Sequence, residues 1–221
     1  MIRALVLKEL RETIGFASIA LAVSLAIVNG LMGRTLLPSI DVLPQRIHVV
    51  PFAGGVFVAY LSYVVIPLAI ALGYRQATRE LGNGVYLFLF HRPIARSTLI
   101  LTKLGVGIAV MLVVQAIPIL LFGWWAATPG NHPSPFEWSM TRGAWQFMLF
   151  SPIVYAGAFL TGLRPGRWIG TRLLPLAASG LYFGVVMMVP DQWWLRIPVA
   201  AVFYGLLAVD IRAIASERDY G

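Results

Sequence analysis

The sequence predicts an all-α, polytopic membrane protein with six transmembrane helices and both termini in the cytoplasm. Three observations support this prediction: an apolar composition, a series of long uncharged segments, and an uneven distribution of basic residues between the connections. Of the 221 residues, 59% are hydrophobic and only 12% are charged, and the mean hydropathy is +0.80. A soluble domain is about a quarter charged. A chain this apolar could not keep its surface compatible with water, so lipid is its expected solvent.

The uncharged segments locate the membrane spans. The first, from Thr13 to Gly33, has a length of roughly 31 Å as a helix, which matches a hydrocarbon core of about 30 Å. The sixth is less clean than the others, because Arg196 lies near one end and Asp210 near the other, where charged side chains reach the membrane surface. The predicted spans are residues 13–33, 49–74, 104–128, 143–163, 173–190 and 193–211.

The basic residues set the orientation. With the N-terminus inside, all but four of the 17 lysines and arginines lie on the cytoplasmic side. Positive charge concentrates in cytoplasmic loops, so both termini are expected there. The four exceptions are Arg34, Arg46, Arg142 and Arg196.

The tryptophans agree with this orientation, because all but Trp168 fall at the predicted outer boundary, as an interfacial belt would. The net charge of +8 and the pI near 10.3 then follow from membrane topology, and nucleic acid is not an expected partner. The chain has no cysteine, which excludes disulfides and thiolate metal sites.

Residues 1–12 precede the first span and carry both charged and apolar side chains. We expect them to form a short cytoplasmic helix lying at the membrane interface, ahead of a transmembrane domain at 13–221. Glu9 lies within the apolar face of that helix, so its amphipathic pattern is flawed. The alternative is a charged extension of the first span.

The connection between the second and third spans, residues 75–103, is the largest predicted inside segment. Gly82, Asn83 and Gly84 tolerate positive φ angles and allow the chain to reverse, and Pro93 suits the first turn of a helix. Residues 75–103 therefore predict a helix–turn–helix elbow that projects into the cytoplasm and docks to a soluble partner. The alternative is an ordinary charged loop held at the lipid headgroups.

The order of residues in this elbow resembles the ABC type 2 permeases, the membrane subunits of one class of ATP-binding-cassette exporters. The family pattern is a glutamate, a Gly-rich turn, an apolar run, Pro-x-x-Arg and a lysine ahead of the third span. It is filled here by Glu80, Gly82 and Gly84, the run 87–90, Pro93, Arg96 and Lys103. Six spans with both ends inside is also the family plan. Re-entrant helices and large outer domains found in larger members have no room here, so the resemblance is to a minimal six-span form.

The resemblance implies a permease that moves a substrate across the cytoplasmic (inner) membrane of a prokaryote. No G-x-x-x-x-G-K-[ST] motif is present, so the chain itself is not expected to be an enzyme, and ATP and Mg²⁺ would be bound by a separate ABC ATPase subunit. A second permease copy or a homologue would complete a dimer in the bilayer. The implied ATPase-coupling residues are Arg79, Glu80, Gly82, Arg92, Pro93, Arg96 and Lys103, with Arg164 and Arg167 as a second cytoplasmic contact.

Other polar and small residues within the spans have two interpretations each. Asn29 and Gln115 are candidates for lining a substrate route, or for hydrogen bonding between helices. Gly180 and Gly184 are spaced for close helix packing, either within the chain or at a dimer seam. Asp210 is expected to pair with Arg212 or Arg172 rather than to relay protons.

The sequence offers little for catalysis or metal binding. H-E-x-x-H and G-x-S-x-G motifs are absent, and the three histidines fall in three different connections. We expect no metal site, and a largely apolar pathway that favours lipids, amphipathic peptides or hydrophobic drugs. The main alternative function is an integral membrane scaffold or assembly subunit without an ATPase, whose basic loops bind anionic lipid. An intramembrane enzyme is a third hypothesis.

Overall fold

The computed structural model describes residues 2–34, 50–82, 96–132, 134–164, 171–188 and 193–217. These residues form helices and no strand, which confirms the all-α prediction for this part of the chain. The helices are α1 (Ile2–Leu31), η1 (Ala53–Gly55), α2 (Val56–Gly82), α4 (Arg96–Ala127), η2 (Trp138–Thr141), α5 (Arg142–Phe150), α6 (Pro152–Leu163), α7 (Leu174–Met188) and α8 (Trp193–Glu217).

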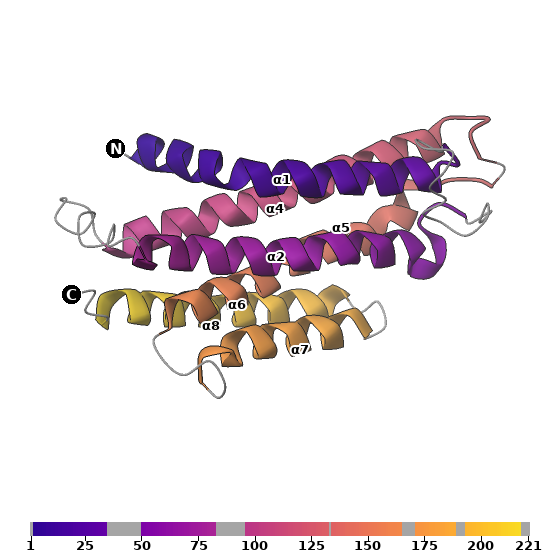
Figure 1. Cartoon of the computed structure of the whole chain (residues 1–221). Helices are drawn as coiled ribbons and strands as arrows, with labels where there is room; N and C mark the ends of the chain where they lie inside the picture. The colour runs from indigo at the N-terminus through magenta and orange to yellow at the C-terminus, as the bar shows by residue number, and fades with distance from the viewer. Residues whose placement is uncertain are drawn as a thin grey trace.

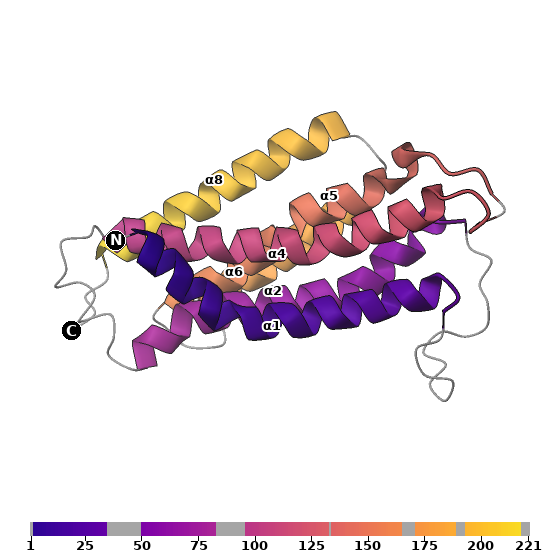
Figure 2. The ribbon, with the colours of Figure 1, turned by 90° about the horizontal axis from the view of Figure 1, so that it is seen from above.

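The long helices run side by side in one elongated bundle (Figure 1). The first turns of α1 and the last turns of α8 lie at the same end of the bundle in both views (Figures 1 and 2). Every residue of α6 is buried, and α6 packs on α2, α4, α7 and α8. This helix is therefore the centre of the bundle.

Four segments of the described chain are helical, long and apolar enough to cross a membrane. They are Arg3–Leu31, Ala53–Arg79, Thr98–Ala127 and Trp138–Leu163. With 26 to 30 residues each, they have lengths of roughly 39 to 45 Å, against a hydrocarbon core of about 30 Å. They correspond to the first four predicted spans and indicate a membrane protein.

The last two predicted spans differ from these four. The fifth forms α7, whose 15 residues give a length of roughly 22 Å, which is short for the hydrocarbon core. The sixth forms α8, whose 25 residues are long enough but include Arg196 and Asp210. Helix length sets α7 apart from the first four, whereas α8 has the length but is not among the candidate spans found in the described residues.

The fourth predicted span, 143–163, is divided into α5 and α6. Pro152 is the first residue of α6 and has no N–H for the Met148 carbonyl one turn earlier, to which Ser151 Oγ donates at 3.4 Å instead. Ser151 lies between the two helices and donates a hydrogen bond from Oγ to Gln115 Oε1 of α4 at 3.0 Å. A polar bond to a neighbouring helix thus fixes the junction.

The predicted separate interfacial helix at residues 1–12 is not what the described chain forms. Helix α1 is continuous from Ile2 to Leu31, although its first turns are bent relative to the rest (Figure 2). Hydroxyl bonds from Thr13 to Glu9 O and from Ser18 to Ile14 O are of the kind that bends helices. Glu9, the residue that interrupts the apolar face of residues 1–12, is fully buried. That face of α1 therefore lies against the interior of the bundle.

Helix α1 ends at a glycine in the left-handed region. Gly33 has φ of 72°, and its N–H bonds to Gly30 O while the Arg34 N–H bonds to Asn29 O, both at 3.0 Å. This is the Schellman arrangement, which satisfies the last carbonyl groups of a helix. It explains why the helix stops where the predicted first span stops.

The bundle has an apolar surface and a partly polar interior. Exposed positions include Ile14, Val113, Leu181 and Val209, each more than half accessible. Among the residues that the structure describes, ten polar or charged side chains are buried instead: Glu9, Thr13, Ser24, Gln76, Lys103, Gln115, Thr141, Ser151, Thr161 and Ser179. An extensive apolar surface is unusual for a soluble monomer and is what lipid contact requires.

Glycines allow the closest helix contacts. A Cβ on Gly73 of α2 would lie 2.5 Å from Tyr155 O of α6, and a Cβ on Gly162 would lie 2.5 Å from Ala77 Cβ. On the other side of α6, a Cβ on Gly157 would meet Ser179 Oγ of α7 at 2.1 Å. Small residues let membrane helices approach in this way.

Candidate functional site

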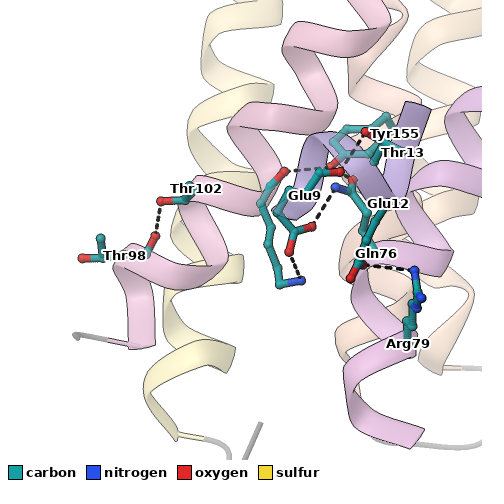
Figure 3. A network of polar contacts seen from close by, with 9 residues as sticks. Glu9, Glu12, Thr13, Gln76, Arg79, Thr98, Thr102 and Tyr155 are labelled. Atoms are coloured by element: carbon teal, nitrogen blue, oxygen red, sulfur yellow. Dashed lines mark hydrogen bonds and ion pairs between the residues drawn. The ribbon is translucent and has the colours of Figure 1, made fainter. Parts of the chain in front are cut away.

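A buried polar network joins four helices near the end of the bundle that holds the first turns of α1 (Figure 3). Lys103 of α4 donates from Nζ to Glu9 Oε1 of α1 at 2.7 Å. Gln76 of α2 donates to the other carboxylate oxygen, Glu9 Oε2, at 3.2 Å. The Tyr155 hydroxyl of α6 donates to Gln76 Oε1 at 2.7 Å. Each helix contributes one side chain to a continuous chain of hydrogen bonds.

The ion pair in this network is enclosed by protein. The side chain of Glu9 is 0% exposed and that of Lys103 is 1% exposed. The two opposite charges compensate each other, and the bond from Gln76 satisfies the second carboxylate oxygen. Ionisable residues inside a membrane bundle are expensive and usually mark a functional position.

Gly107 makes room for the network. A Cβ at this position of α4 would lie 2.0 Å from the Tyr155 hydroxyl oxygen and 2.6 Å from Gln76 Oε1. Gly107 is one helical turn after Lys103, so the lysine and the space for the tyrosine lie on one face of α4. Helix α4 therefore provides both the charge of Lys103 and, at Gly107, the space that the Tyr155 and Gln76 side chains occupy.

A second ion pair lies beside the buried one. Arg79 Nη1 of α2 is 3.2 Å from Glu12 Oε2 of α1, and both side chains are partly exposed (Figure 3). The guanidinium of Arg75, one turn earlier in α2, lies over the Phe16 ring at 4.5 Å. The first half of α1 is thus attached to the end of α2 and to the beginning of α4, the two helices that flank residues 83–95.

The structure places some of the predicted coupling residues and not others. Arg79 is partly exposed near the end of α2, and Gly82 is the last residue of that helix. Lys103, at the end of the predicted elbow, is buried and paired with Glu9, so its side chain faces the interior of the bundle and not a partner surface. The side chains of Glu80 and Arg96, and residues Arg92, Pro93 and Arg167, lie outside the described part of the structure.

The other predicted cytoplasmic contact is also engaged within the chain. Arg164 pairs with Asp210 of α8, and not with a free partner surface. Among the described residues the ion-pair partner of Asp210 is Arg164 and not the predicted Arg172, whose Nε donates to Thr161 O. The side chain of Arg212 is outside the described residues. Asp210 is thus an ion-pair partner, as expected, but with a different arginine.

The polar residues within the spans divide between their two interpretations. Gln115 is fully buried; it donates from Nε2 to Met111 O and accepts from Ser151, which supports interhelical bonding rather than a substrate-lining role. Asn29 is half-buried near the end of α1.

The two glycines predicted to serve close helix packing lie in α7. A Cβ added to Gly180 or Gly184 would meet nothing within 4 Å, so neither serves internal packing. Glu9 and Lys103 form a buried ion pair inside the bundle, a charge pair that was not predicted from the sequence.

The central role of Glu9 is what sequence reasoning missed. Its signal was the single acidic residue within an apolar helical face, together with one lysine at the start of a long apolar span. No group of three potential metal ligands occurs among the described residues. Comparisons with protein-family models, curated proteins and solved structures found no match for this chain.

Proposed function

We propose that this chain is the permease subunit of an ATP-binding-cassette exporter, driven by a separate ATPase. It would span the cytoplasmic membrane of a prokaryote six times, with both termini inside, and pair with a second permease copy or a homologue. The elbow at 75–103 would dock to the ATPase, which would bind ATP and Mg²⁺. The resemblance of the elbow residues to the ABC type 2 pattern supplies the family.

The attachment of α1 to α2 and α4, the helices on either side of residues 83–95, carries this proposal. The Glu9–Lys103 pair connects α1 to the start of α4, and the Glu12–Arg79 pair connects it to the end of α2. A displacement of residues 83–95 must act on α2 and α4, because the chain is continuous. The two ion pairs would then pass the displacement to α1, and the Gln76–Tyr155 bond to α6.

Such a connection is useful only if a partner changes state. In the proposal, ATP binding closes the ATPase dimer, and the closed form favours a different arrangement of the helices. The ATPase must therefore bind the two arrangements of the permease with different affinity. A scaffold that only anchors to lipid would need the positive charges of the elbow but not these links to α1.

The proposal predicts the effect of reversing the charge of Arg79 in the purified complex with its ATPase. Arg79→Glu would place two carboxylates together and break the link from α2 to α1. We expect permease-dependent ATP hydrolysis to fall about fivefold, which is at the low end of typical coupling between sites. The low end applies because the Arg79–Glu12 pair is partly exposed, and exposed ion pairs are weak. The rate of phosphate release, measured with and without the permease, checks this.

The double variant Arg79→Glu with Glu12→Arg is the matched control. It restores opposite charges with their positions exchanged, so we expect most of the hydrolysis to return. Hydrolysis at the wild-type rate in Arg79→Glu alone would contradict the proposed coupling route. A fall that the double variant does not repair would contradict the role of this ion pair.

A further inference from the structure

The chain enters α2 through a turn that contains a strained phenylalanine. The N–H of Ala53 bonds to Val50 O at 3.0 Å and closes this turn, in which Pro51 is second and Phe52 third. Phe52 has φ of 62° and ψ of −6°, the left-handed conformation that the third position of a type II turn requires. Glycine or asparagine usually occupies that position, because a Cβ there is crowded by the backbone. Among the described residues, Phe52 is the only one other than glycine with a positive φ.

Three other aromatic rings contact the ring of Phe52. Its centroid lies 4.9 Å from that of Phe57 in α2 and 4.9 Å from that of Phe122 in α4. The third ring belongs to Phe136, at 6.1 Å, in the segment before η2. Phe57 and Phe122 also stack on each other at 5.2 Å, and both are buried. Aromatic pairs stabilise a structure beyond the burial of their area, so these rings offset the cost of the backbone conformation at Phe52.

The aromatic cluster of Phe52, Phe57, Phe122 and Phe136 joins α2 to α4 at the end of the bundle where α2 begins and α4 ends (Figure 1). Phe57 is the second residue of α2, and Phe122 lies in the last two turns of α4. The two ion pairs with α1 lie toward the other ends of the same helices. Helices α2 and α4 are thus linked by charged side chains toward one end and by aromatic rings at the other.

We propose that Phe52 is a releasable latch that holds α2 and α4 together at this end of the bundle. In the closed state, the three rings keep Phe52 in its strained conformation. When those contacts are lost, its backbone relaxes to a negative φ, the ring leaves its place beside Phe57 and Phe122, and the ends of the two helices separate. Strain that the surrounding structure holds in place is typical of elements with two states. A permanent joint needs the rings but no strained residue.

The latch is a property of the chain alone and goes beyond the proposed coupling to an ATPase, although it acts on the same two helices. Distances between spin labels on α2 and α4 therefore test it in the purified full-length chain without a partner. The chain has no cysteine, so labels attach only at introduced positions. Ala59→Cys and Leu121→Cys, both at exposed positions, place one label on each helix near the aromatic cluster.

We expect mainly one distance between these labels in the otherwise unchanged chain. Adding Phe52→Ala should produce a second, longer distance, because alanine lacks the ring and keeps the strain. Phe52→Gly also lacks the ring, but glycine adopts the left-handed conformation without strain. The ratio of the longer to the shorter distance should therefore be at least about fivefold lower in Phe52→Gly than in Phe52→Ala. Equal ratios in the two variants would overturn the proposal, since the backbone of Phe52 would then store no strain.

Two controls separate release of the latch from a general loosening of the bundle. Phe203→Ala removes a ring that stacks on Tyr182 at 4.4 Å, between α8 and α7, and should leave the label distance unchanged. Labels at Ala71→Cys and Ala109→Cys, exposed positions farther along α2 and α4, should keep one distance when Phe52→Ala is added. The proposal would be overturned if Phe52→Ala produced no longer distance at the first label pair. It would also be overturned if a longer distance appeared in Phe203→Ala or at the second label pair.

Discussion

Replacing Lys103 by methionine should lower the free energy of unfolding by about 3–5 kcal/mol, the usual cost of leaving one charge of a buried pair without its partner. Methionine fills a similar volume, so little of this loss comes from packing. The cost arises because Glu9, which is 0% exposed, keeps its charge in an apolar surrounding or must take up a proton. Reversible unfolding of the chain in mixed detergent micelles measures the difference.

The neutral double variant isolates the electrostatic part of that loss. Lys103→Met with Glu9→Gln leaves no charge in the buried network of Glu9, Gln76, Lys103 and Tyr155, and an amide at position 9 can still bond to Gln76. We therefore expect it to recover most of the stability, since well-packed neutral groups replace buried ion pairs at little cost. A loss below about 1 kcal/mol in Lys103→Met would place it in the range of surface ion pairs and contradict the burial of this one.

Replacing Gly73 by alanine should destabilise the chain by about 1–3 kcal/mol, as overpacking does in a close-packed interior. A Cβ at this position would lie 2.5 Å from Tyr155 O and 3.0 Å from Phe159 N. Both atoms belong to the backbone of α6, so no side chain can turn away to relieve the contact. Helices α2 and α6 would have to separate, and the buried bond from Tyr155 to Gln76 would lengthen.

Gly105→Ala is the matched control for this prediction. Gly105 is also in a helix interior, and a Cβ there would meet nothing within 4 Å. Alanine should then stabilise the helix by up to about 1 kcal/mol through its higher helix propensity. Unfolding of both variants in the same detergent compares them. Effects of the same sign and size would contradict the close packing of α2 against α6.

Much of the fold could be predicted from the sequence because lipid imposes simple rules on composition. Long uncharged segments had to be helical, and four of them have the length that a membrane requires. Within the fourth predicted span, Pro152 lies at a helix boundary, between α5 and α6. The length of α7 was less predictable, because an apolar segment does not show where its helix will begin or end.

The buried network could not be predicted because its members are far apart in the chain. Glu9 and Lys103 are separated by 94 positions, and Gln76 and Tyr155 by 79. Their contact depends on how α1, α2, α4 and α6 pack, which no local pattern specifies. For the same reason the place of Lys103 in the elbow motif does not show that packing buries its side chain inside the bundle.

The proposed coupling to an ATPase is tested most directly by purifying the tagged chain from its host in a gentle detergent. Stoichiometric partners are identified by mass spectrometry, and ATP hydrolysis of the sample is assayed. An elbow variant with Glu80→Arg and Arg92→Glu is compared with the control variant Arg34→Glu. Arg34 follows the C-terminal end of α1, the end that is not attached to α2 and α4 by the two ion pairs. The account predicts a co-purifying ABC ATPase in wild type and in Arg34→Glu, and its loss in the elbow variant. A clean complex without a nucleotide-binding subunit would contradict the account and favour a membrane scaffold.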